Sequence, residues 1–225
     1  ICADSLKVLP KLPSASVDAV VTDPPYELGF MGKKWDRSGI AYQVATWQAI
    51  LRVLKPGGHL LAFGGSRTHH RMMVAIEDAG FEIRDCLMWL YGQGFPKSHN
   101  LHGEWEGWGT ALKPAYEPII LARKPLSEKN VAENVLRWGT GAINIDGCRI
   151  PTDEVIMNHS RSAEAAKSKG KYGDSKAQKT HQTPGQKFGR FPANVLLDEV
   201  SAAMLDEQSG IRQGGARPAR RGPGT

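Results

Sequence analysis

The sequence predicts an α/β fold whose sheet is doubly wound and mostly parallel, with an antiparallel hairpin at its edge. Short apolar segments bounded by turn formers alternate with segments of helical spacing, which is the order of such a sheet. The last two predicted strands follow each other without a helix, which indicates the hairpin. A chain of 225 residues, 40% of them hydrophobic, can bury one sizeable core.

The first strand and the first long helix are predicted close together. Residues 17–22 read Val-Asp-Ala-Val-Val-Thr between turn formers, so we expect a buried strand. Apolar side chains recur at helical spacing over residues 41–54, which predicts an amphipathic helix. The run Lys-Pro-Gly-Gly at residues 55–58 should end it.

The next elements complete the sheet. Residues 59–63 form a second apolar run, and residues 68–79 show helical spacing up to Gly80. Strands are then expected over residues 81–91 and 117–122, separated by a segment rich in glycine and tryptophan. These two strands are the predicted hairpin.

The charge of the chain is unevenly distributed. The net charge is +6, and lysine and arginine gather in residues 161–190 and again in residues 212–221. This pattern fits contact with a polyanion such as nucleic acid, and it fits a solvated basic surface or tail equally well.

Other compositional features exclude several classes of protein. No run of about 18 apolar residues is present and no apolar leader opens the chain, so we expect no membrane span or secretory signal and a cytoplasmic location. The three cysteines are widely spaced, and no metal site is expected. His69 and His70 would point to different sides of a helix, which argues against a metal pair there.

Asp23-Pro24-Pro25-Tyr26 follows the first predicted strand directly. Ligands of open α/β sheets bind at this carboxyl end of the strands. The alternative is an ordinary strand-to-loop turn, since Asp and Pro are common turn residues.

These four residues, with residues 12–18 before them and Leu-Lys-Pro-Gly-Gly at residues 54–58 after them, resemble the core of the DNA N6-adenine and N4-cytosine amino-methyltransferases. Residues 30–36 and 107–114 resemble phage and prophage members of this group. The resemblance covers most of residues 1–150 and resumes at residues 190–195. It implies a Rossmann-like methyltransferase sheet.

The resemblance assigns catalytic roles to Asp23, Pro24, Pro25 and Tyr26. The amino group of a base is a poor nucleophile because its lone pair is delocalised into the ring. Hydrogen bonds from that amine to the Asp23 carboxylate and the Pro24 carbonyl would free the lone pair, and the two prolines hold that carbonyl in place. Tyr26 offers a face for stacking on a base taken out of the duplex.

The cofactor implied by the resemblance is S-adenosylmethionine, with Asp4, Asp23 and Pro24 as binding residues. An N-cap role for Asp4 in a short helix is almost as plausible. In this permuted arrangement a Phe-x-Gly-x-Gly loop for the cofactor comes last, and none follows Pro192. We therefore expect a fragment of a longer protein, and weak cofactor binding by this chain alone.

The expected partner is double-stranded DNA. Lys33, Lys34 and Trp35 lie in a loop after the predicted site and could contact phosphate and stack on a base. The alternative is a loop anchored by its tryptophan, with solvated lysines. The aromatic residues of segment 92–109, Trp105 and Trp108 among them, could clamp a flipped base or pack as a small separate cluster.

The resemblance also suggests a domain division. We expect a catalytic core over residues 1–128 and an insert or target-recognition region over residues 129–190 with a polar, flexible segment at 151–187. Residues 191–225 would begin the cofactor-side region.

Three functions remain to be compared. Adenine N6 is the favoured target because family members with Asp in the first motif position usually methylate adenine, and cytosine N4 is the alternative. A DNA-binding remnant without catalysis is the third possibility. Cytosine-C5 chemistry is excluded: Glu133-Asn134-Val135 copies a short motif of those enzymes, but the Pro-Cys that carries their nucleophile does not occur.

Overall fold

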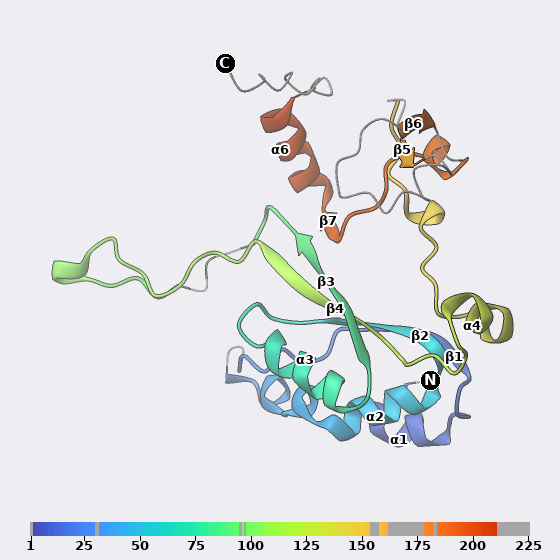
Figure 1. Cartoon of the computed structure of the whole chain (residues 1–225). Helices are drawn as coiled ribbons and strands as arrows, with labels where there is room; N and C mark the ends of the chain where they lie inside the picture. Colours follow the sequence, from blue (N-terminus) through green and yellow to red (C-terminus); the bar gives the residue numbers. More distant parts are fainter. Residues whose placement is uncertain are drawn as a thin grey trace, which may run out of the picture.

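The computed structural model of the chain contains a five-stranded sheet in the order β1-β2-β4-β3-β7 (Figure 1). The structure describes residues 2–29, 32–94, 96, 98–153, 158–161, 178–181 and 184–210. The strands of the sheet are β1 (Val17–Thr22), β2 (Leu54–Phe63), β3 (Glu82–Leu90), β4 (Tyr116–Arg123) and β7 (Val195–Leu197). A separate two-stranded sheet pairs β5 (Asn158–Arg161) with β6 (Gln178–His181).

The sheet is mixed, rather than mostly parallel as predicted. β1 pairs with β2 and β3 with β7 in parallel, whereas β4 is antiparallel to both β2 and β3. The α/β class and the antiparallel pairing of β3 with β4 are therefore confirmed. The predicted place of this hairpin at the edge is wrong, because β4 lies between β2 and β3, and β7 adds to the end of β3. The run that forms β7 is too short to indicate a strand by itself.

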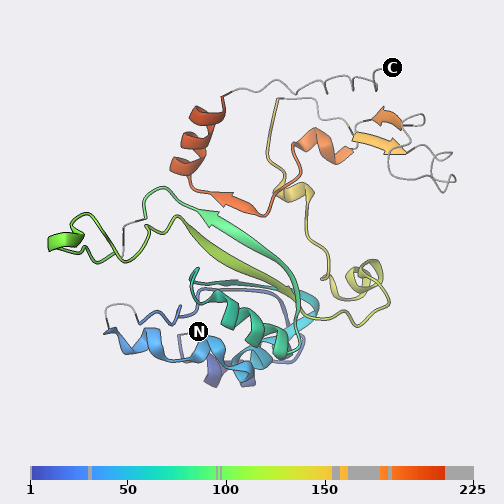
Figure 2. The same ribbon diagram turned by 60° about the vertical axis from the view of Figure 1, so that its left-hand side comes forward.

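The first three helices lie on one side of the sheet (Figures 1 and 2). They are α1 (Ser5–Val8), α2 (Val44–Val53) and α3 (His69–Asp78). The connections β1-α2-β2 and β2-α3-β3 both advance in the same direction across the sheet, so right-handed crossovers place both helices on the same face. These helices thus cover one face of the sheet, and the second helical layer of the predicted doubly wound fold stays a prediction.

The main hydrophobic core lies between this helical layer and the sheet. Alternate residues of β2 and β4 point into it, as the two-residue period of a strand requires. Its largest fully buried members include Trp47, Leu54, Leu60, Ile76 and Ile120. On the opposite face the side chain of Val21 is 68% exposed.

The run Lys-Pro-Gly-Gly does end α2, but it belongs to β2 rather than to a loop. Gly57 has a φ of 79°, which favours glycine. Its N–H donates to the Lys124 carbonyl (3.1 Å), and the Lys124 N–H donates to the Gly58 carbonyl (2.9 Å). These bonds extend the sheet back to the end of the helix.

Helix α4 (Val131–Trp138) was not predicted. The Asn130 side chain accepts from the Glu133 N–H (3.0 Å), and Gly139 ends the helix in the left-handed conformation. This helix contacts β2, so residues 129–138 pack on the sheet although they lie beyond the predicted boundary at residue 128. The domain division itself stays a prediction.

The remaining helices are shorter or lie near the end of the described chain. α6 (Glu199–Ser209) follows β7 in the chain. The 3-10 helices are Leu9–Lys11, Lys34–Arg37, Ile40–Tyr42, Gly103–Trp105, Asp146–Cys148 and Pro184–Phe188. None of the helices in the described ranges is long and apolar enough to cross a membrane.

The predicted flexible segment 151–187 lies largely outside the described residues, and so does the basic run 212–221.

An arm formed by residues 98–112 extends from the sheet between β3 and β4 (Figures 1 and 2). Its two sides are joined by hydrogen bonds, including one from the Leu101 N–H to the Trp108 carbonyl (2.9 Å). Near its tip the rings of Trp105 and Trp108 lie 5.2 Å apart at 88°. These two tryptophans therefore form a small cluster of their own.

Candidate active site

A cavity of about 450 Å³ opens at the carboxyl end of β1. Pockets of this size accept small organic ligands. We call it the turn pocket. Its lining residues are Asp23, Pro24, Pro25, Tyr26, Leu28, Trp35, Asp36 and Glu117. All four residues of the predicted catalytic turn thus line one cavity.

Tyr26 is held at two points by residues distant in sequence. Its hydroxyl donates to Glu117 Oε2 on β4 (3.0 Å), and its main-chain carbonyl accepts from Thr68 Oγ1 (2.7 Å). Burial and the carboxylates of Glu117 and Asp23 raise the pKa of the Tyr26 hydroxyl above its ordinary value. The hydroxyl therefore stays protonated and remains a donor to Glu117.

The chain after Tyr26 makes a tight turn around Asp36. Glu27 has a φ of 57°, an uncommon conformation for a residue with a side chain. Its N–H donates to Asp36 Oδ1 (2.9 Å), and the Gly29 N–H donates to the Asp36 carbonyl (3.0 Å). Asp36 is only 2% exposed. This buried residue therefore shapes the wall of the turn pocket that follows Tyr26.

Asp23 is exposed, whereas Pro24 and Pro25 are half-buried. The Asp23 carboxylate is thus accessible to a ligand in the turn pocket. The two consecutive prolines restrict the backbone and supply no N–H that could compete for its acceptors. In one cavity, the carboxylates can accept hydrogen bonds from the amino group of a planar ligand. The aromatic side chains can pack against the ring of the same ligand.

Among the predicted DNA-binding residues, the structure brings Trp35 to the turn pocket and leaves the lysines outside its lining. Trp35 is 59% exposed although it lines the cavity. Lys33 and Lys34 precede it on the surface.

Asp4, the other predicted cofactor residue, does not line the turn pocket. Asp4 is the N-cap of α1, because its carboxylate accepts a hydrogen bond from the Leu6 N–H (3.0 Å). The capping role weighed for Asp4 is therefore present. Its cofactor role stays a prediction.

Three polar residues of the site were not assigned a role from sequence: Thr68, Glu117 and Asp36. Glu117 lies 91 residues from Tyr26, so only the pairing of strands brings them together. Asp36 lies in a run already noted for its family resemblance, but nothing local marked it as buried. Glu117 could have been noticed from sequence, because it is a charged residue at the start of an otherwise apolar strand.

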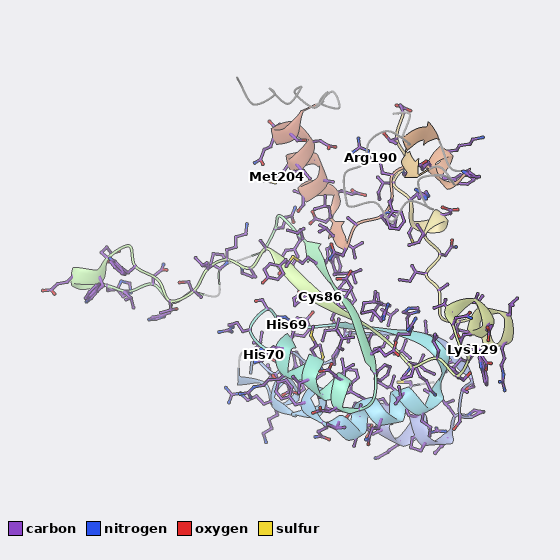
Figure 3. All side chains as sticks on the ribbon, in the orientation of Figure 1. His69, His70, Cys86, Lys129, Arg190 and Met204 are labelled. Atoms are coloured by element: carbon purple, nitrogen blue, oxygen red, sulfur yellow. The ribbon has the colours of Figure 1, made fainter. Side chains whose placement is uncertain are left out.

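His69 and His70 lie in the first turn of α3 beside the sheet (Figure 3). Their rings are 6.3 Å apart and nearly perpendicular. In the described ranges, no group of three or more His, Cys, Asp or Glu side chains is placed to hold a metal ion.

Solved structures of DNA methylases overlap part of this chain. A DNA modification methylase candidate from Thermus thermophilus is 26% identical, with a TM-score of 0.41 over 57% of this chain and 53% of that one. PvuII DNA methyltransferase, a cytosine-N4-specific enzyme, is 17% identical, with a TM-score of 0.42 over 60% of this chain and 52% of that one.

Two curated relatives are type II methyltransferases. M.HindIII of Haemophilus influenzae is 25% identical over 73% of this chain and 55% of its own length. M.HpaI of Haemophilus parainfluenzae is 31% identical over 44% of this chain and 33% of its own length. The chain spans about half the length of the first of these relatives, and less of the second.

The family comparison covers much more of the chain. Residues 17–201 match the model of the N6/N4 methylase family, described as DNA methylase. The match begins at β1, directly before the turn pocket, and ends in α6. The protein therefore belongs to the N6/N4 DNA methylase family.

Proposed function

We propose that the protein transfers a methyl group from S-adenosylmethionine to the exocyclic amine of a base in double-stranded DNA, with adenine N6 as the favoured target. The observation that carries this proposal is the turn pocket, in which Asp23, Pro24 and Tyr26 line one cavity at the carboxyl end of β1. Family membership supports the same chemistry.

Asp23 and Pro24 would activate the amine. A base amine in the turn pocket would donate one N–H to the Asp23 carboxylate and the other to the Pro24 carbonyl. These bonds would favour tetrahedral geometry at nitrogen and leave its lone pair free to attack the methyl carbon of the sulfonium. The methyl–sulfur bond would break as the new bond forms, the sulfur would leave as a neutral thioether, and the amine would give up one proton along its hydrogen bond to Asp23. No covalent bond to the enzyme is needed, and the described residues of the turn pocket include no cysteine.

The turn pocket fits a base taken out of the duplex and a cationic cofactor. Tyr26 supplies an aromatic wall and Trp35 a second aromatic side chain, which suits a flat ring. The exposed carboxylate of Asp23 favours a cation nearby. S-adenosylmethionine supplies a methyl group on a sulfonium, and we propose that Asp23 and Pro24 lie against it, as predicted together with Asp4.

Duplex DNA is the proposed partner. Lys33 and Lys34 are exposed next to Trp35, where they could neutralise phosphates flanking the target base. The net charge of +6 favours the same partner.

The direct test is methylation of unmethylated genomic DNA by the protein expressed from its complete gene, followed by nucleoside mass analysis. We expect N6-methyladenine, because the turn begins with Asp. N4-methylcytosine would instead support the alternative target. The absence of both products, with DNA binding retained, would favour a non-catalytic DNA-binding remnant and contradict the proposal.

A further inference from the structure

Glu117 reaches the turn pocket from a different part of the sheet than the predicted catalytic turn. It lies on β4, whereas Asp23 and Tyr26 follow β1, and β2 separates these two strands. On β4, Glu117 pairs in register with Trp89 of β3. The backbone of Glu117 is therefore held by the sheet rather than by a flexible loop.

The bond from Tyr26 to Glu117 restricts the tyrosine ring. A tyrosine side chain has two rotatable bonds before its ring, and anchoring its hydroxyl removes much of that freedom. The Thr68 hydroxyl holds the main-chain carbonyl of the same residue. Tyr26 is thus fixed both at its backbone and at the far end of its ring, before any ligand is bound.

The environment keeps this bond in one form. Burial is the largest cause of the raised pKa of Tyr26, followed by the Glu117 carboxylate. The tyrosine is therefore the donor and the glutamate the acceptor throughout the physiological pH range. Its hydroxyl is thus held by Glu117, a residue that also lines the turn pocket.

We propose that Glu117 is a positioning residue for methyl transfer: by accepting the hydrogen bond from Tyr26, it fixes the ring plane against which the target base stacks. This inference rests on the proposed function. Glu117 acts through Tyr26 and need not touch the base. A tilt of the ring would displace the amine from Asp23 and Pro24, and small displacements from reactive geometry are costly to rate.

The test is a double-mutant cycle of Glu117→Ala and Tyr26→Phe in the protein from the complete gene, with kcat and KM for DNA measured separately. We expect each single variant to lower kcat about 10-fold, with little change in KM, because stacking remains but its orientation is lost. In the double variant we expect no further loss. Glu117→Gln should recover most of the activity, because its amide oxygen can accept the same hydrogen bond.

The matched control is Glu77→Ala, which removes an exposed carboxylate from α3 outside the turn pocket. We expect it to leave kcat unchanged. The thermal unfolding midpoints of Glu117→Ala and Glu117→Gln should also be compared. If they are equal while kcat differs, the lower kcat of the alanine variant reflects positioning and not a general loss of stability.

The possible outcomes distinguish a failure of the positioning role of Glu117 from a failure of the proposed methyltransferase function. An active wild-type protein whose single losses multiply in the double variant would overturn the positioning role, because Glu117 would then act independently of Tyr26, for example on the base itself. Failure of Glu117→Gln to recover activity would also overturn it. A wild-type protein that methylates no DNA would overturn the proposed function and this inference with it.

Discussion

Two acidic residues from distant parts of the chain hold the turn that follows β1. Glu117 holds the ring of Tyr26, and Asp36 holds the backbone of Glu27 directly after it. Glu27 adopts a left-handed conformation, which costs energy and persists only where its surroundings enforce it. At the scale of single residues, the site therefore depends on support outside the Asp-Pro-Pro-Tyr motif.

Replacing Asp36 should loosen this turn. Asp36→Ala leaves the Glu27 N–H without its acceptor and removes a side chain that is 2% exposed. We expect a loss of about 1–3 kcal/mol in the free energy of unfolding, measured by urea denaturation. Asp36→Asn keeps an acceptor oxygen and should lose less. Equal stability of the alanine variant and the wild type would contradict this role.

The sequence predicted the pocket residues that lie in one local run, and it missed those that only the fold brings to the pocket. Asp23, Pro24, Pro25 and Tyr26 are adjacent in sequence, and their composition points to one chemistry. Glu117 becomes part of the site only through the pairing of β2 with β4, which no local pattern encodes.

At the scale of elements, α4 is fastened to the start of β2 through Asn134, which is fully buried. Its side-chain amide donates to the carbonyls of Pro56 (2.9 Å) and Thr140 (2.8 Å), and its oxygen accepts from the Ser127 N–H (3.1 Å). Every polar atom of this side chain thus has a partner. Glu133-Asn134-Val135, the copy of a C5-methyltransferase motif, has a structural role here.

Removing the Asn134 side chain should detach this helix from the sheet. Asn134→Ala empties a fully buried position and takes a donor from the buried Thr140 carbonyl, whereas the Pro56 carbonyl keeps the Thr140 hydroxyl as a donor (2.6 Å). We expect a loss of about 2–4 kcal/mol in the free energy of unfolding. The matched control is Leu136→Ala on the same helix, where the side chain is 88% exposed and the expected change is small. Urea denaturation measures both. Similar losses in the two variants would contradict the role of Asn134.

Elements with strong periodicity were predicted well, and those that depend on end signals were not. β1 was predicted with its observed bounds, and α2 and α3 within a few residues of theirs. α4 was missed because its signals are the Asn130 cap with Glu133 and the Gly139 stop, rather than a long apolar stripe. The two-residue period of β4 could not reveal that it inserts between β2 and β3.

At the scale of the whole molecule, the described chain is a mixed sheet with α1, α2 and α3 on one face and a pocket at the carboxyl end of its first strand. The direction of the parallel crossovers explains why α2 and α3 share one face. The strand order brings β1 and β4 close enough for Tyr26 to meet Glu117. The central claim is that this arrangement presents Asp23 to the amine of a base.

The most direct measurement of this claim is methyl transfer to duplex DNA by Asp23→Ala, in the protein expressed from its complete gene. We predict that kcat falls about 100-fold or more, because an acceptor that acts on the reacting amine is lost, while the dissociation constant for DNA changes little. Asp18→Ala, which removes an exposed carboxylate from β1 itself, should keep its activity. Methylation of duplex DNA by Asp23→Ala at the wild-type rate would contradict the account.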